Sequence, residues 1–271
     1  MKVSCLGPKE SYSSLAADKL CKGAEKLYCS SFAATLNLLT EGAADAAVLP
    51  VENCIMGSVV QNLDLISTTE NVMGVGEYLL PIEHRLVTKG NVPYSDIQRV
   101  CSHVQALSQC SEFITNNFPD AKLVYTHSTA ESLSMLDEHT AGIVGAHVKE
   151  RMGTDGFVFS EENIADAKEN FTRFLLFKRG STPPEHSEYV YFSAVCKREK
   201  VGELCSLLEI FTRHSINVTR VESRPVRDIF GNYRFFIEFE GDIGSDNVKR
   251  ALKEAEETAE AYKLLGAYGE I

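Results

Sequence analysis

The chain has 271 residues, of which 44% are hydrophobic and 24% are charged, and its formal net charge is -11 at pH 7. This composition is typical of a folded globular protein, and the length favours two or three compact units. The acidic charge argues against nucleic acid or an anionic membrane as a partner, because such surfaces bind blocks of Lys and Arg. A small anionic substrate remains compatible, since a few cations and helix N-termini can bind it locally.

The N-terminal residues MKVSCLGP and the eight cysteines indicate the cellular compartment. The opening has no basic region and no long apolar stretch of a secretory signal, and no run is long enough to span a bilayer, so we expect a cytoplasmic protein. The cysteines form no Cys-x-x-Cys pair, and most lie in apolar segments. We therefore predict reduced, mostly buried thiols rather than metal ligands or disulfides.

The first two thirds of the chain alternate short strand-like runs with helical patterns, which is typical of an α/β fold with largely parallel sheets. The predicted strands lie at residues 3–7, 45–51, 85–89, 99–103, 122–127, 141–146 and 174–177. The pairs Ser102 with Gln105 and Ser128 with Glu131 fit the capping box, each directly after a strand. Ligands bind such folds where strands end and helices begin.

Residues 180–186, GSTPPEH, form the best linker candidate, because Gly, Pro and Ser separate two apolar strands there. Beyond the linker we predict a strand at 188–197, a helix at 202–214, strands at 217–226 and 233–241, a helix at 246–265 and a short last strand near AYGEI. The segment IFGNY has the Gly-Asn signal of a hairpin turn. This βαββαβ order indicates an α+β, ferredoxin-like unit.

Five segments of the first two thirds carry a more specific pattern: LGPKESYSSLAA, VLPVENCIMGSV, EYLLPIEHRL, SHVQALSQC and IADAKENFTRF. Together and in this order they resemble the motifs of the prephenate dehydratase family, whereas one alone would be a weak signal. The resemblance implies an α/β two-lobed catalytic domain, periplasmic-binding-protein-like, with the substrate between the lobes. We expect this domain at 1–180, with lobe one at about 1–76 and 158–180 and lobe two at about 77–157.

The chemistry that the resemblance implies is the conversion of prephenate into phenylpyruvate, water and CO2 in phenylalanine biosynthesis. Prephenate is a dianion whose ring becomes aromatic as the C4 hydroxyl and CO2 depart together. The protein then has to hold two carboxylates, donate to the departing hydroxide and favour neutral CO2. This carbon–oxygen lyase reaction requires no metal and no organic cofactor.

Three residues form the expected catalytic set, two of them in contact with the substrate and one that supports them. The resemblance makes Thr172 the catalytic hydroxyl that donates to the leaving oxygen, although β-propensity alone also explains a threonine in an apolar strand. Asn53 suits a direct hydrogen bond to the substrate. Glu52 is expected to order the turn, because a bare carboxylate repels a dianion.

The motifs also supply the expected substrate contacts: Ser11, Tyr12, Ser13, Cys54, Gly57, His84, Ser102, Gln105, Gln109, Asn170, Arg173 and Phe174. Several alternatives stay open. Because neighbouring strand residues point apart, Arg173 either faces the substrate or anchors the other lobe. His84 is either a substrate contact or a buried histidine with its own partner. Glu10, Cys54 and Val104 depart from the family pattern, and we expect Glu10 to be turned outward.

Residues 187–271 resemble an ACT domain, and VESRPV at 221–226 matches the Glu-Ser-Arg-Pro segment of phenylalanine-responsive dehydratases. Such domains pair side by side, so we expect a homodimer or a tetramer with phenylalanine as effector. The implied phenylalanine-binding residues are Gly202, Glu203, Leu204, Glu222, Ser223, Arg224 and Pro225. Glu203 stands where the family has Ala; it meets either the ligand's ammonium or the helix macrodipole, and we favour the macrodipole.

Other functions remain open at this point. An arogenate dehydratase performs the same chemistry on the aminated substrate, for which Glu10 offers an ammonium partner. A non-catalytic amino-acid sensor is the alternative from another class, although the Thr172 motif argues against it. A fused chorismate mutase is not expected, because no long helical extension precedes Met1.

Overall fold

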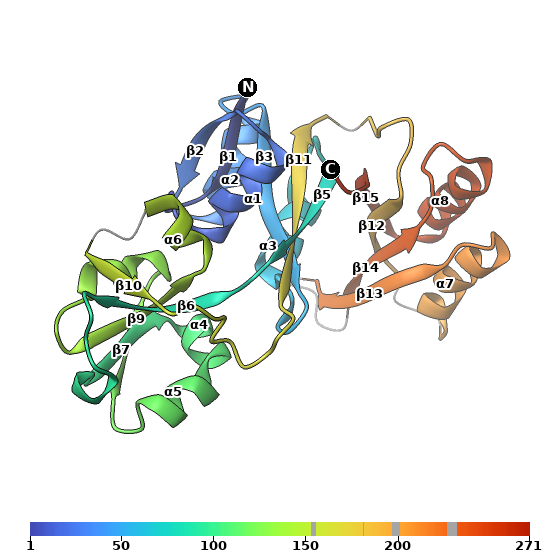
Figure 1. Ribbon diagram of the computed structural model, residues 1–271. Coiled ribbons are helices and arrows are strands. Elements are labelled where there is room, and N and C mark those ends of the chain that lie inside the picture. The colour runs from blue at the N-terminus through green and yellow to red at the C-terminus, as the bar shows by residue number, and fades with distance from the viewer. Residues whose placement is uncertain (153–155, 181, 197–200, 227–231) are drawn as a thin grey trace.

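The computed structural model describes residues 1–152, 156–180, 182–196, 201–226 and 232–271 (Figure 1). The chain forms two lobes followed by a C-terminal domain that packs against the first lobe. The predicted hairpin turn at IFGNY lies largely outside the described residues. Five of the eight cysteines are buried. Within the described ranges, none of the helices is long and apolar enough to cross a bilayer.

The first lobe contains one end of a ten-stranded sheet. Strands β1 (Lys2–Leu6), β2 (Glu25–Cys29) and β3 (Ala46–Asn53) pair in parallel, whereas β11 (Phe171–Arg179) runs antiparallel between β3 and β5 (Val72–Pro81). The short β4 (Gly57–Ser58) pairs with the end of β3. Helix α1 (Tyr12–Leu20) packs on one face of this sheet, and α2 (Phe32–Thr40) and α3 (Val60–Thr68) pack on the other.

The second lobe has a five-stranded sheet in the order β10-β6-β9-β7-β8. Its elements are β6 (His84–Lys89), β7 (Arg99–His103), α4 (Val104–Gln109), α5 (Ser111–Asn117), β8 (Lys122–Thr126), β9 (Thr140–Gly145), α6 (His147–Met152) and β10 (Phe157–Phe159), with 3-10 turns at Tyr94–Asp96 and Ala130–Met135. Strand β7 pairs in parallel with β8 and β9, whereas β6 pairs antiparallel with both β9 and β10. The two α/β lobes are as predicted, whereas the sheets are mixed rather than largely parallel.

The chain passes between the lobes twice. Pro81 still pairs with Phe171 in the first lobe, and Phe157 pairs with Lys89 in the second. The crossings therefore lie at residues 82–83 and 160–170. These positions fall a few residues after the predicted limits near 76 and 158, because strand pairing continues past them. The exact domain limits stay a prediction.

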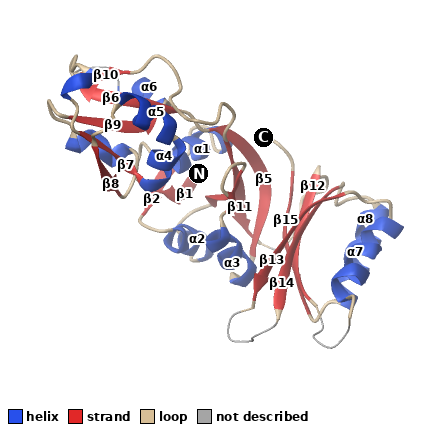
Figure 2. Cartoon of the chain, turned by 90° about the horizontal axis from the view of Figure 1, so that it is seen from below, coloured by secondary structure: helices blue, strands red, loops and turns tan. Residues whose placement is uncertain are grey.

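The C-terminal domain has the predicted βαββαβ order. Its elements are β12 (Tyr189–Val195), α7 (Glu203–Arg213), β13 (Val218–Pro225), β14 (Tyr233–Glu240), α8 (Asp246–Thr258) and β15 (Ala261–Tyr268). Figure 2 shows both helices on the outer face of the sheet, where they share a core with β12, β14 and β15. The helix predicted to reach residue 265 ends at Thr258, because the following residues pair with β12.

The inner face of the C-terminal sheet packs on the first lobe. One core cluster joins Leu63 and Leu175 of the first lobe with Tyr191, Phe236 and Tyr268 of the C-terminal domain. Strand β15 also meets β5 through the parallel pair formed by residues 266 and 74. A Cβ on Gly266 would lie 2.9 Å from the carbonyl oxygen of Gly74, so the close approach requires glycine. The two domains therefore share one continuous sheet.

Candidate active site

A cavity of about 420 Å³ lies between the two lobes. Of the predicted site residues, those that line it are Ser11, Tyr12, Ser13, Asn53, His84, Gln105, Gln109, Thr172 and Phe174. They come from both lobes and from the crossing strands. Because the cavity combines apolar walls with a few convergent polar groups, it is the candidate active site. Glu10 is not among its lining residues and is half-buried, so its outward orientation stays a prediction.

Asn53 and Thr172 meet at the ends of two paired strands, β3 and β11. Asn53 Nδ2 donates to Thr172 Oγ1 at 3.0 Å and to Asn170 Oδ1 at 2.7 Å. Asn53 Oδ1 accepts from the backbone N–H groups of Ile55 and Met56 at 3.1 and 3.0 Å, which fixes the orientation of the amide. Because Thr172 Oγ1 already accepts from Asn53, its own O–H is left to donate into the cavity.

A chain of hydrogen bonds continues from Asn170 into the second lobe. Asn170 Nδ2 donates to Gln109 Oε1 at 3.2 Å, and His84 Nε2 lies 2.9 Å from the same oxygen. An amide oxygen only accepts, so His84 Nε2 carries the proton in this arrangement. Burial lowers the pKa of His84, because the charged imidazolium is poorly solvated there. His84 is thus both a cavity-lining residue and a buried histidine with a partner.

The start of helix α1 forms another wall of the cavity. Ser11 is the N-cap: its hydroxyl accepts from Ser14 N at 3.1 Å and donates to Leu6 O at 2.8 Å. Tyr12 reaches the crossing segment, where its hydroxyl donates to Glu83 O at 2.6 Å. Burial raises the pKa of Tyr12, so it stays neutral. Backbone N–H groups at a helix start attract negative charge, which suits this wall to an anion.

Five predicted contact residues do not line the cavity: Ser102, Cys54, Gly57, Asn170 and Arg173. Ser102 is buried, and its hydroxyl donates to Ile143 O at 2.6 Å instead of pointing into the cavity. The capping box predicted for Ser102 is also wrong, because His103 caps α4 by accepting from Gln105 N. Cys54 is exposed, and its Sγ accepts from Phe171 N at 3.1 Å.

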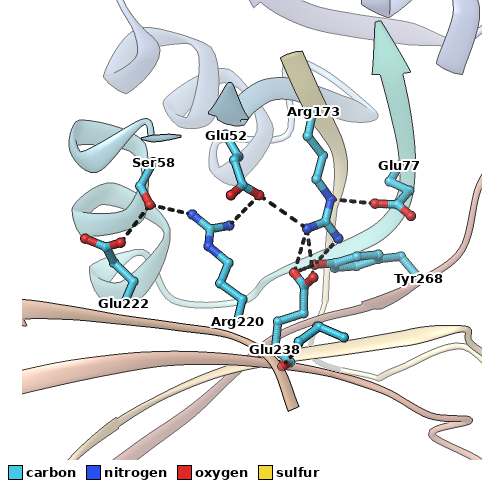
Figure 3. A network of polar contacts seen from close by, with 9 residues as sticks. Glu52, Ser58, Glu77, Arg173, Arg220, Glu222, Glu238 and Tyr268 are labelled. Carbon is cyan, nitrogen blue, oxygen red and sulfur yellow. Dashed lines mark hydrogen bonds and ion pairs between the residues drawn. The ribbon is translucent and has the colours of Figure 1, made fainter. Parts of the chain in front are cut away.

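Glu52 and Arg173 point away from the cavity toward the C-terminal domain (Figure 3). Arg173 contacts Glu77 and Glu238, and Glu52 contacts Arg220. Of the two alternatives for Arg173, the structure contradicts the substrate contact and supports an anchoring role, although toward the C-terminal domain and not the other lobe. It also contradicts the catalytic assignment of Glu52. Arg173 points away from the cavity because neighbouring residues of a strand point to opposite faces, and its neighbour Thr172 lines the cavity. Glu52 points away because a β-bulge in β3 interrupts the alternation of that strand.

Sequence reasoning missed several residues on the second-lobe side of the cavity. His103, His127 and Thr129 line it together with Ser128. The signal was present, since His127 ends a predicted strand, Ser128 and Thr129 directly follow it, and Ser128 was identified as a cap. Ser128 Oγ accepts from Glu131 N at 3.2 Å, as that capping box requires. Within the described ranges, neither lysine nor arginine lines the cavity.

The predicted effector residues lie on two sides of the C-terminal sheet. Glu222 and Arg224 face the first lobe, where Glu222 accepts from Ser58 Oγ at 3.0 Å and Arg224 lies 3.2 Å from Asp64. Helix α7, which begins at Glu203, covers the opposite face, and Ser223 alternates toward that side. Within one chain, the segment around Gly202 and the Glu222 side chain therefore do not form one pocket.

Comparisons with known proteins agree with this architecture. Residues 3–182 match the family model described as prephenate dehydratase, and residues 191–257 match the ACT domain. The chain is 33% identical to the bifunctional chorismate mutase/prephenate dehydratase of Aquifex aeolicus, over 99% of this chain and 73% of that protein.

The chain is also similar to solved structures. A prephenate dehydratase from Arthrobacter aurescens in complex with L-Phe has 29% identity and a TM-score of 0.88, over 100% of this chain and 90% of that one. GqqA, described as a novel type of quorum-quenching acylase, has 25% identity and a TM-score of 0.85, over 100% and 98% of the two chains. Proteins of one fold thus carry different descriptions, so chemistry has to be argued from the site.

Proposed function

The chain belongs to the prephenate dehydratase family, and we propose that it converts prephenate into phenylpyruvate, water and CO2 in the cavity between its two lobes. The observation that carries this proposal is the hydrogen bond from Asn53 Nδ2 to Thr172 Oγ1 at 3.0 Å. Because the threonine oxygen accepts from Asn53, its own O–H proton is left to donate toward the substrate. A fixed donor of this kind matches a reaction whose leaving group is hydroxide.

Thr172 acts on the C4 hydroxyl of the substrate. As the C4–oxygen bond breaks, its electron pair leaves with the oxygen, which is stabilised by the Thr172 O–H and takes up one proton from solvent to become water. The bond between the ring and its carboxylate breaks at the same time, giving CO2, and its electrons complete the aromatic ring. A threonine is too weak an acid to supply the proton alone, so its role is hydrogen-bond donation.

The cavity binds two carboxylates with hydroxyl, amide and backbone donors. Among the described residues no lysine or arginine lines it, and burial lowers the pKa of the lining residues His84 and His103. The helix start at Ser11 provides N–H groups for a carboxylate that remains charged. A weakly cationic wall leaves the ring carboxylate poorly stabilised, which favours its departure as neutral CO2.

The C-terminal ACT domain responds to phenylalanine in this proposal. The support is the family match and the L-Phe complex of the Arthrobacter relative. Binding involves the two predicted segments, 202–204 and 222–225, across paired ACT domains of a homodimer or tetramer. Because the two segments lie on different faces within one chain, a second copy is the natural way to bring them together. The cellular location stays the cytoplasm, as predicted from the sequence.

The first test is the rate of phenylpyruvate formation from prephenate by the wild type, Thr172→Ala and Thr172→Ser. We expect turnover by the wild type, loss in the alanine variant and partial recovery in the serine variant, which keeps the hydroxyl. Arogenate is tested as the aminated alternative substrate. An N-acylated amine is tested because a solved structure of the same fold is described as an acylase. Glu10, which would favour arogenate, does not line the cavity, so prephenate is the expected substrate. Folded wild type that does not turn over prephenate contradicts the proposal, and turnover of arogenate alone would make the aminated compound the substrate.

A further inference from the structure

An interdomain network of ion pairs and hydrogen bonds occupies the side of the sheet opposite the cavity (Figure 3). Its members are Glu52, Ser58, Glu77, Arg173, Arg220, Glu222, Glu238 and Tyr268. Four of them belong to the catalytic domain and four to the ACT domain. The network therefore joins the two domains beside the strand ends that hold Asn53 and Thr172.

Arg173 is the first centre of the network. Its Nε lies 2.6 Å from Glu77 Oε2, and its Nη1 lies 2.8 Å from Glu238 Oε1 in β14. The three side chains are only 11%, 8% and 5% exposed, so water screens these charges weakly. Tyr268 completes the contact because its hydroxyl donates to Glu238 Oε2 at 2.8 Å. Loss of one partner from such a pair leaves an uncompensated buried charge.

Arg220 of β13 is the second centre. Its Nη1 lies 3.3 Å from Glu52 Oε2, and its Nη2 donates to Ser58 Oγ at 2.6 Å. Ser58 donates in turn to Glu222 Oε2 at 3.0 Å. These contacts hold the end of β3 and the paired strand β4 against the ACT domain. The turn between them contains the two N–H groups that orient Asn53 Oδ1.

The network and the catalytic pair share the same two strand ends. Glu52 directly precedes Asn53 and pairs with Arg173, while Asn53 pairs with Thr172. If the contacts of Glu52 or Arg173 change and either strand shifts, Asn53 therefore moves relative to Thr172. A displacement of about 1 Å at a reacting group can reduce a rate about 100-fold. The register of these two strands is thus a sensitive point for catalysis.

We propose that Glu238 and Arg220 of the ACT domain are positioning residues for the dehydration step. Glu238 holds Arg173, and Arg220 holds Glu52. Because Arg173 and Glu52 directly neighbour Thr172 and Asn53 in the chain, these contacts fix the positions of the two site residues on the other side of the sheet. The inference rests on the proposed function, because the step it describes is the loss of water from prephenate. It makes the ACT domain part of the active-site scaffold even without a bound effector.

The experiment compares steady-state kinetics of the full-length variants Glu238→Gln and Arg220→Gln with wild type, without phenylalanine. We expect kcat for prephenate to fall about tenfold or more while KM changes less than about twofold, since the cavity walls that bind the carboxylates are untouched. Glu238→Asp, which keeps the carboxylate at a shorter reach, should recover part of kcat. An unchanged kcat in both glutamine variants overturns the proposal.

Lys263→Met is the matched control. Lys263 also joins the ACT domain to the first lobe, by donating to Ile66 O at 2.7 Å, but it contacts the end of α3 and not β3 or β11. We expect it to lower the unfolding temperature and to leave kcat unchanged. A similar fall of kcat in the control would show a merely structural effect and overturn the proposal.

Two further measurements separate the possible failures. Tyr268→Phe removes one hydroxyl from the network and nothing from the cavity, so it replaces Glu238→Gln if that variant does not fold. We expect a kcat between those of wild type and Glu238→Gln. A kcat equal to that of wild type contradicts the proposal. Wild-type turnover of prephenate is measured first. Its absence refutes the proposed function, whereas its presence with unaffected variants refutes only the positioning role.

Discussion

Asn53 Nδ2 donates to Thr172 Oγ1 at 3.0 Å although the two residues are 119 positions apart in the chain. The oxygen of the same amide accepts from two backbone N–H groups, and its nitrogen also donates to Phe171 O at 3.0 Å, so the two ends cannot exchange without losing these three hydrogen bonds to the backbone. Because the donor end of Asn53 faces Thr172, the hydroxyl of Thr172 accepts from Asn53 and can donate its own proton elsewhere. This relationship supplies the sharpest test of the site.

Asn53→Asp should abolish most of the activity, because the carboxylate has nearly the same size as the amide but puts an acceptor where Nδ2 donates to Asn170, Phe171 and Thr172. The carboxylate still accepts from the turn, but it now accepts from Thr172 as well, which draws the hydroxyl proton away from the substrate. We expect kcat to fall by about 100-fold, as when one donor to a leaving oxygen is removed. Cys54→Ser is the control, since Cys54 is exposed and does not line the cavity. Equal kcat values for Asn53→Asp and wild type would refute this assignment of donor and acceptor.

His84 should make the protein less stable in mild acid. Its folded-state pKa lies below the ordinary value of 6.5 because burial disfavours the imidazolium. A depressed pKa gives stability that is present above pH 6.5 and is lost as the pH falls through the folded-state pKa. Urea unfolding of wild type and His84→Gln between pH 7 and 5 checks this. We expect the free energy of unfolding to fall less steeply with pH in the variant, and parallel slopes would contradict the prediction.

Local sequence patterns were sufficient to predict most elements of the fold. Strands such as β7 and β9 follow from short apolar runs, and the βαββαβ order follows from alternating periodicities. The end of α8 was misplaced because residues 261–268 have no strong local strand signal and become a strand only by pairing with β12. Long-range pairing overrides local preference there.

The face on which Glu52 lies could not be predicted from the sequence. Regular alternation along β3 places Glu52 beside Pro50, which lines the cavity. In the structure Phe174 pairs with Pro50 and Arg173 with Glu52, so Val51 is the extra residue of a β-bulge. The bulge turns Glu52 to the back and Asn53 toward Thr172. The family resemblance identified Asn53 and Thr172, but only the strand pairing shows why Glu52 leaves the site.

Glu77→Gln should be tolerated at neutral pH, where Arg173 keeps its ion pair with Glu238. Burial raises the pKa of Glu77 above 4.5, and Arg173 offsets this effect only in part. A raised pKa means that the carboxyl contributes stability below pH 4.5 and loses it as the pH rises through the folded-state pKa. Glutamine removes the charge and keeps an acceptor for Arg173 Nε. The unfolding temperature of the variant, relative to that of wild type, should be higher at pH 7 than at pH 5. A lower relative unfolding temperature at pH 7 would refute the argument.

Glu203→Ala tests the two readings of the residue that departs from the family pattern. Glu203 is the first residue of α7, and Gly202 provides no side-chain cap, so a carboxylate there compensates the helix N-terminus. On this reading the variant loses about 0.3–1 kcal/mol of stability, and phenylalanine inhibits it as strongly as wild type. If Glu203 instead binds the ammonium of phenylalanine, inhibition weakens while stability hardly changes. Phenylalanine titration of prephenate turnover, combined with chemical unfolding of the same variant, therefore distinguishes the two. Glu209→Ala, in the middle of α7 and away from the helix end, is the control that should affect neither quantity.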